Sequence, residues 1–160
     1  MNKNKWIMLI FVSVMILFCV VKLSNSENNS INGNQELPET KVLLYFYDSE
    51  EKILAPEYRI VSLELLKKDM EENMLIELLK GPTLPNYQRV IPEGTKVNAT
   101  NISGDKMIID FSKEFIVEDE TEEENARKIF SIVYTMTEIK EINEVEIYVD
   151  GKFVTNEKRL

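Results

Sequence analysis

The 160-residue chain has no histidine and only one cysteine, and both facts restrict the chemistry that it can perform. Without histidine there is no imidazole base, no Ser/His/Asp or Cys/His nucleophile system, and no histidine-containing zinc or haem site. One cysteine permits neither an intramolecular disulfide nor a four-cysteine metal cluster. Positive charge is also scarce, since 19 Lys and Arg stand against 28 Asp and Glu. Because binding to a phosphate backbone depends on positive charge, we expect no nucleic acid partner.

An apolar run near the amino end predicts the compartment. Residues 6–21 contain one polar side chain, that of Ser13, and follow Lys3 and Lys5. A helix of this length spans about 24 Å, which approaches the ~30 Å hydrocarbon core of a bilayer when flanking lysines reach the interface. All acidic residues come after position 26, so the positive-inside rule places the amino end in the cytoplasm. We therefore expect residues 1–23 to be an uncleaved signal anchor, with the C-terminal domain outside the cytoplasm.

Two other fates of this segment give a secreted or a lipid-anchored protein. Small residues alternate at Ser24 and Ser26, which is typical of a cleavage site that would release the domain. Lipidation at Cys19 is disfavoured, because Phe18 precedes it where a small residue is required. Beyond the anchor, 16 basic residues face 28 acidic ones, so charge does not attract this portion to an anionic membrane.

Hydrophobic periodicity divides the rest into a flexible polar linker, 24–40, and one domain, 41–160. The apolar run 41–48 predicts a strand buried on both faces, and Pro56 restricts the next strand to an edge. Two N-terminal caps, Asp69 with Glu72 and Thr121 with Glu124, mark helix starts. The strands expected are 41–48, 53–62, 95–103, 106–111 and 144–149, and the helices are 69–80 and 121–139.

This order, β-β-α-β-β-α-β, predicts an α+β fold. We expect a mixed or antiparallel sheet of about five strands with two helices packed on one face, preceded by the N-terminal apolar helix. Gly104 and Asp105 join two strands into a hairpin, and the three prolines of 82–94 shape a loop. Residues 62–68 extend the second strand or add a helical turn.

Five segments in this order carry a resemblance to a known family. They are 77–82 (ELLKGP), 91–97 (IPEGTKV), 109–115 (IDFSKEF), 131–138 (SIVYTMTE) and 149–152 (VDGK). Together they resemble the GerMN domain of sporulation and spore germination, over about 42–153. The resemblance implies a domain without known catalysis, similar to ring-building modules of secretion systems, that acts in assembly between the membranes around the forespore. Family members commonly have a lipobox or paired domains, and this chain departs from both patterns.

We therefore expect a non-catalytic extracytoplasmic protein of sporulation or germination that assembles with itself or with envelope proteins near the membrane. No catalytic, cofactor-binding or metal-binding residue is assigned, and the substrate-binding residues are unknown. One alternative is a peptidoglycan-binding module, for which the aromatic candidates are Tyr47, Tyr58, Tyr87 and Tyr148. The other is a wall hydrolase that uses carboxylates alone, with Asp110 and Glu114 as the pair.

Several marked residues have a structural interpretation that we favour over a functional one. Gly81 and Pro82 end a helix through a left-handed residue, and residues 92–94 turn into a strand. The threonines Thr135 and Thr137 are expected to bond back to helix carbonyls, with Glu138 solvated.

The acidic run 118–124 has six carboxylates in seven positions. It lacks the glycine and ligand spacing of an EF-hand, so we interpret it as a solvated first helical turn whose charges favour the helix N-terminus, rather than a loose calcium site. The sequons at Asn28, Asn98 and Asn101 are expected by chance in a chain this rich in asparagine.

Overall fold

The computed structural model describes residues 38–158, and within them the chain forms seven strands, three α-helices and one 3-10 helix. The strands are β1 (Glu39–Asp48), β2 (Ile53–Ser62), β3 (Tyr87–Gln88), β4 (Val97–Ser103), β5 (Lys106–Phe111), β6 (Glu144–Val149) and β7 (Lys152–Lys158). The helices are α2 (Leu63–Lys68), α3 (Met70–Leu79), η1 (Lys113–Phe115) and α4 (Glu122–Met136).

The strands form two separate sheets. One has three strands in the order β2-β1-β3, and all its neighbours are antiparallel. The other has four strands in the order β4-β5-β6-β7 and is mixed, because β5 and β6 run parallel. The chain crosses from β5 to β6 through α4, as a parallel connection requires.

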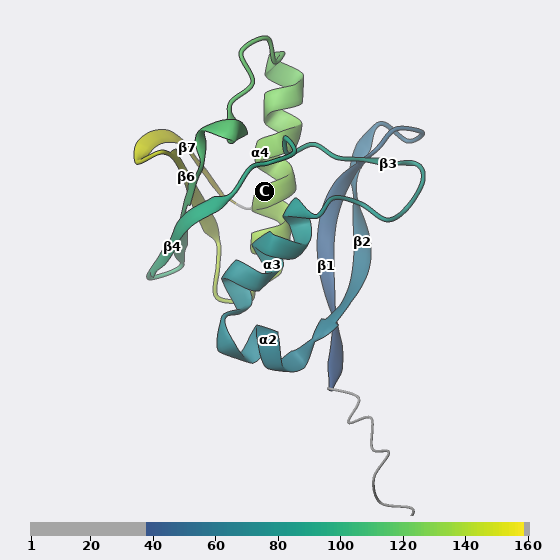
Figure 1. Cartoon of the computed structure of the whole chain (residues 1–160), viewed down its shortest axis with the longest axis vertical. Coiled ribbons are helices and arrows are strands. Elements are labelled where there is room, and N and C mark those ends of the chain that lie inside the picture. The colour runs from purple at the N-terminus through teal and green to yellow at the C-terminus, as the bar shows by residue number, and fades with distance from the viewer. Residues whose placement is uncertain (1–37, 159–160) are drawn as a thin grey trace, which may run out of the picture. The chain divides into compact units, whose positions relative to one another are not determined.

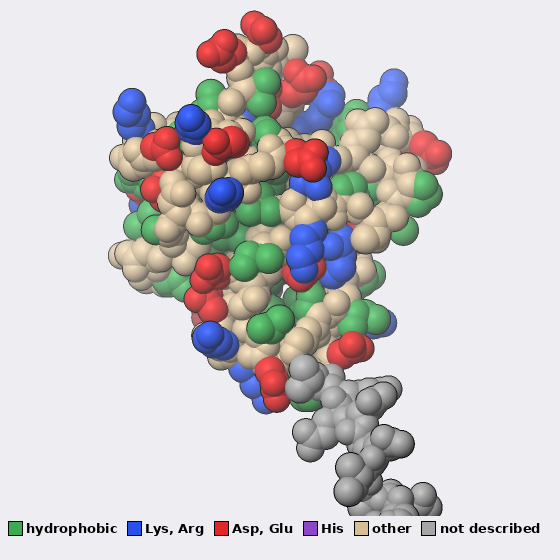
Figure 2. Space-filling view, in the orientation of Figure 1, with side chains coloured by type: hydrophobic (Ala, Val, Ile, Leu, Met, Phe, Trp, Pro, Cys, Tyr) green, Lys and Arg blue, Asp and Glu red, His purple; other side chains and the backbone are tan. Residues whose placement is uncertain are grey.

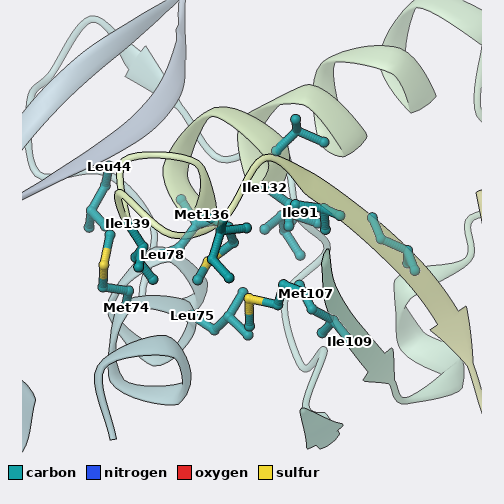
Figure 3. Close-up of a cluster of buried hydrophobic side chains, with 14 of the residues drawn as sticks. Leu44, Met74, Leu75, Leu78, Ile91, Met107, Ile109, Ile132, Met136 and Ile139 are labelled. Carbon is teal, nitrogen blue, oxygen red and sulfur yellow. The ribbon is translucent and has the colours of Figure 1, made fainter. Parts of the chain in front are cut away.

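Helix α4 lies between the two sheets, with β1 and β2 on one side and the β6–β7 pair on the other (Figure 1). Helix α3 likewise touches β1 and β4. The core fills the space between these elements. Figure 3 shows Leu44, Met74 and Ile139 on one side of the core and Met107 and Ile109 of the other sheet on the opposite side, with Leu75 and Met136 between them. One continuous core therefore holds both sheets to the helices.

Local signals that the sequence carries are confirmed. Thr121 and Glu124 form a reciprocal capping box at the start of α4, and the Asp69 carboxylate accepts the Glu72 N–H at the start of α3. Gly104 has φ +68° in the β4–β5 hairpin. Each of these features depends on residues at most three positions apart, which is why the sequence reveals them.

The structure confirms the α+β class and all five predicted strands, but it distributes the strands over two sheets instead of one. The two predicted helices accordingly pack between sheets rather than on one face of a single sheet. Of the two alternatives left open for residues 62–68, the structure has the helical one, because residues 63–68 form the short helix α2. No sequence pattern predicted β3, η1 or β7. Asp150 and Gly151 both have positive φ, 47° and 73°, as in a type I′ hairpin turn, and β7 returns from it along β6.

Strand β1 differs from the expectation of burial on both faces. Val42, Leu44 and Phe46 are buried, whereas Leu43 and Tyr45, which point to the opposite face, are half-buried. Strand β2 is at a sheet edge, as Pro56 predicted. The predicted anchor, residues 1–23, and nearly all of the predicted linker, 24–40, lie outside the described residues. Between residues 38 and 158, no helix is both long and apolar enough to cross a membrane.

Candidate interaction surfaces

The segment between α3 and β4 is held by a buried carboxylate. Glu57 of β2 is 3% exposed, and it accepts hydrogen bonds from the Thr83 N–H at 2.8 Å, the Leu84 N–H at 3.1 Å and the Arg59 guanidinium. Burial by itself raises the pKa of Glu57, but the bonds from Arg59, Thr83 and Leu84 outweigh it, so the pKa lies below its usual value. The carboxylate is therefore charged and fixes the backbone that follows Gly81.

Two arginines complete the end of α3. Arg59 donates to the Gly81 carbonyl at 2.9 Å, and Arg89 donates to the carbonyls of Leu79 and Lys80, each at 2.6 Å. These carbonyls lie at and just after the end of α3, where a helix leaves C=O groups without intrahelical partners. Gly81 has φ +85°, which confirms the left-handed helix end, and a Cβ atom there would lie 2.6 Å from a terminal nitrogen of Arg89. The motif at 77–82 therefore ends α3 at a point where Arg59 and Arg89 bond to the backbone carbonyls.

The edge of β1 that faces away from β2 has different hydrogen-bond partners along its length. At its carboxyl end, Tyr47 and Asp48 pair with β3. In the middle, α4 supplies two buried hydroxyls: Ser131 donates to the Tyr45 carbonyl at 2.6 Å, and Thr135 accepts the Tyr45 N–H at 3.0 Å. Thr135 thus bonds to a strand rather than back to its own helix. Thr137, as expected, donates to the Tyr134 carbonyl, and the exposed Glu138 accepts the Tyr45 hydroxyl.

These bonds fix which way the backbone of β1 points. Because the N–H and C=O of Tyr45 face α4, the Tyr45–Pro56 pair is a non-hydrogen-bonded position of the β1–β2 ladder. Pro56, which has no N–H, therefore occupies the one kind of ladder position where that group is not needed. The register explains why proline is tolerated inside a ten-residue strand.

Strand β2 exposes large apolar side chains on the face that turns away from the core. Tyr58 is 72% exposed and Ile60 is 60% exposed, and Pro56 beside them is also exposed. An open sheet edge with apolar side chains is a surface that natural proteins usually protect or use for binding. This stretch of β2 is a candidate interaction surface, which we call the β2 edge (residues 56–60).

A second candidate is a hollow of about 420 Å³ between the β1–β2 turn and α4. Its apolar wall includes Leu54, Phe130 and Tyr134, and the two rings lie 5.8 Å apart. Arg127 stands over the ring of Tyr47, 4.1 Å from its centroid, and pairs with Glu123 at the rim. The arrangement offers aromatic and charged groups to one ligand, and we call it the aromatic hollow.

The four tyrosines chosen from the sequence do not converge on one site. Tyr47 lines the aromatic hollow, while Tyr58 lies on the same face of the sheet but four strand positions away, about 13 Å at ~3.3 Å per residue. Tyr87 is half-buried, and its hydroxyl donates to the Pro56 carbonyl. Tyr148 belongs to the other sheet and donates to Glu146, which raises the pKa of Tyr148.

The carboxylates considered for hydrolysis have structural partners. Asp110 accepts the N–H of Gly151 at 3.0 Å and so supports the β6–β7 turn. The Ser112 hydroxyl bonds to Glu114 and lowers the pKa of that carboxyl, which is the opposite of what a general acid needs. Pro92, Glu93 and Gly94 form a turn, as expected, with the Thr95 N–H bonded to the Pro92 carbonyl.

The acidic run at the start of α4 is partly engaged in ion pairs and caps. Figure 2 shows acidic side chains gathered at the end of the domain where α4 begins. Within this run Glu120 pairs with Lys128, Glu123 with Arg127, and Glu124 closes the capping box. Over residues 38–158, no three His, Cys, Asp or Glu side chains are placed to hold one metal ion.

Lys128 of α4 is a buried cation that the sequence patterns did not predict. Its side chain is 1% exposed, its ammonium group donates to the Phe115 carbonyl at 3.0 Å and lies 4.6 Å from the Phe115 ring centroid. Together with its ion pair to Glu120, this lysine ties the segment after β5 to α4. The sequence signal that could have indicated a buried lysine is the position of Lys128 next to Ile129 in the apolar stripe of α4.

Comparison with solved structures identifies the class of fold. The first GerMN domain of the sporulation protein GerM from Bacillus subtilis matches with 21% identity and a TM-score of 0.59, covering 72% of this chain and 86% of that one. A candidate lipoprotein from Clostridium perfringens matches with 22% identity and a TM-score of 0.52, covering 78% and 90%. The tandem GerMN domains of GerM match with 20% identity and a TM-score of 0.52, over 72% of this chain and 41% of that one. The domain therefore has the GerMN fold.

The sequence profile of the Germane family, described as sporulation and spore germination, matches residues 43–155. This match covers more than half of the chain, and the chain belongs to the Germane family. No curated protein matches. The resemblance inferred from the five motifs is confirmed.

Proposed function

We propose that this protein is a non-catalytic, extracytoplasmic component of sporulation or spore germination that binds envelope proteins or further copies of itself close to the membrane. The observation that carries the proposal is the Germane match over residues 43–155. The apolar segment 6–21 with its preceding lysines supports an anchor that keeps the domain outside the cytoplasm.

The β2 edge supports a binding role. Covering exposed apolar surface is favourable, and Tyr58 and Ile60, 72% and 60% exposed, lie on neighbouring outward positions of one strand, where a single partner surface can cover both. An edge strand adds unpaired main-chain groups to the apolar contact, so that it can hold a partner through both. If copies form a ring, one surface must meet a different surface on the next copy.

Native protein extracted from the membranes of sporulating cells tests this function. We expect an intact mass that begins at Met1, together with a large assembly or a co-purifying envelope protein. A Tyr58→Ser, Ile60→Thr variant should lose the assembly while keeping its fold, and Ile102→Thr, which changes an exposed apolar residue of β4 outside the β2 edge, serves as the control. A lone monomer of the parent protein would refute assembly, and a mass that starts near Glu27 would refute the anchor.

A second candidate function is binding to peptidoglycan, which the aromatic hollow favours. Aromatic rings beside charged groups are the chemistry that holds sugars and short peptides. Sedimentation with purified cell wall separates the two functions. Retention of the parent protein that is lost in Tyr134→Ala and kept in Tyr58→Ser would support wall binding, and no retention of the parent would end it.

A further inference from the structure

The amino-terminal third of β1 has a strand edge that the described part of the chain leaves open. Alternate residues of β1 direct their N–H and C=O groups away from β2. Tyr47 directs them to β3 and Tyr45 to the hydroxyls of α4. The β1–β2 register runs without a shift from Glu39 to Asp48, so Lys41 and Leu43 direct theirs to the same side. Within residues 38–158, neither has a hydrogen-bond partner on that side.

These groups border a groove of about 460 Å³. Its floor and far wall are apolar and come from α2, α3 and the turn after α4: Leu66, Met70, Met74 and Ile139. Met74 and Leu66 are buried in the core beneath the groove, whereas Met70 is 41% exposed along it. A groove between a helix and an unpaired strand edge can accept an extended peptide, which pairs with the strand and places alternate side chains against the apolar wall.

The charge beside the groove differs from that of the whole chain. Lys41 and Lys67 line it together with one carboxylate, Glu138, which also accepts the Tyr45 hydroxyl. The lining is therefore net positive on a chain whose formal charge is −9. Complementary charge favours a segment that carries an acidic residue next to its apolar positions.

We propose that the groove between β1 and the α2–α3 pair binds an extended segment of another envelope protein by strand addition to Lys41 and Leu43, with apolar side chains at alternate positions and an acidic residue facing Lys67. The inference rests on the proposed function and names the chemistry of the partner. Two strand positions offer four main-chain groups about 7 Å apart end to end, so three to five residues of a partner suffice to engage them.

A synthetic hexapeptide tests the proposal with the full-length chain in detergent. The peptide has aspartate at its first position, valine at its third and fifth positions and threonine at the other three, so that the carboxylate and the valines all face the α2–α3 wall. Titration calorimetry measures its affinity, and amide hydrogen exchange measures protection at each residue. We expect the exchange of the Lys41 and Leu43 amides to slow at least tenfold on binding, while the Leu44 amide, already paired with β2, does not change.

Two changes separate strand addition from side-chain contact alone. N-methylation of the peptide at the positions that face β1 removes its donors and should weaken binding about tenfold or more, the value of one to two net hydrogen bonds. Met70→Glu places a charge on the apolar wall at an exposed site and should abolish binding without unfolding the domain. Binding of the N-methylated peptide with unchanged affinity would overturn the proposal.

A charge exchange tests the orientation. Lys67→Glu should lower the affinity for the aspartate peptide several-fold and raise the affinity for a peptide with lysine in place of the aspartate. Lys68 is exposed on the same helix but lies outside the groove, so Lys68→Glu should change neither affinity. Equal effects of the two substitutions would overturn the assigned position of the acidic residue. If no peptide slows exchange of the Lys41 and Leu43 amides, or if exchange slows only when the chain self-associates, the proposal that the groove binds another envelope protein is refuted. Neither result would affect the proposed function if envelope proteins still co-purify.

Discussion

Replacement of Gly81 by alanine isolates how strongly the end of α3 depends on Arg89. Gly81 has φ +85°, and an added Cβ would lie 2.6 Å and 2.8 Å from two guanidinium atoms of Arg89. A left-handed backbone costs a non-glycine residue about 1–2 kcal/mol. The displaced Arg89 also loses its bonds to the carbonyls of Leu79 and Lys80, about 0.5–1 kcal/mol each because the side chain is exposed. We expect Gly81→Ala to destabilise the domain by about 2–4 kcal/mol.

Gly104 provides the matched control. It has φ +68°, but a Cβ there would meet no atom within 4 Å, so Gly104→Ala should cost only the backbone strain, about 1–2 kcal/mol. Urea unfolding of the chain in detergent, followed by circular dichroism, gives both values. In an Arg89→Ala background the cost of Gly81→Ala should fall to that of Gly104→Ala. If the two glycines cost the same with Arg89 present, the coupling between Gly81 and Arg89 does not exist.

Three further predictions follow from the buried polar groups. Glu57→Gln should destabilise the domain by about 2–4 kcal/mol at pH 7. Because the pKa of Glu57 is lower in the folded state, the charged carboxylate stabilises the domain above the unfolded pKa near 4.5, and this stabilisation is lost as the pH falls through the folded pKa. In urea titrations between pH 5 and 3, the variant should therefore lose less stability than the parent. Thr135→Val should cost about 1–3 kcal/mol and speed exchange of the Tyr45 amide, read by hydrogen exchange, because that N–H loses its acceptor; unchanged exchange would contradict the bond. Lys128→Met should cost about 3–5 kcal/mol by leaving Glu120 unpaired, and adding Glu120→Gln should recover much of it in thermal unfolding; no recovery would mean that the ion pair is not the cause.

The parts of the fold that the sequence predicts are those decided by near neighbours. The caps at Asp69 and Thr121 and the turn at Gly104 each depend on a few consecutive residues, and the structure has them where expected. The division into two sheets depends instead on where α4 packs, which no local pattern specifies. Strand β7 was missed because its charged and polar residues do not alternate with apolar ones clearly enough.

The candidate surfaces were predictable only in part. Tyr58 was selected as an exposed aromatic, and it is exposed, but the sequence did not place Ile60 beside it or identify the groove at Lys41. Glu57 stands in phase with the buried Ala55 and Val61, so its period marked it as an inward carboxylate. Ser131 and Thr135 stand four residues apart within the apolar stripe of α4, a spacing that places two hydroxyls on one helix face. Both signals were present, but apart from Arg59, two residues from Glu57, the partners lie more than 25 residues away.

The position of β1 in the fold also determines how the domain would respond to force. The described chain enters the domain at the first residues of β1, so tension transmitted from the amino-terminal side acts on that strand before any other. Its hydrogen bonds to β2, to β3 and to the hydroxyls of α4 lie across the direction of the strand. A pull along β1 therefore loads these bonds together in shear, instead of opening them one after another. This attachment resists tension better than a strand peeled away from its end.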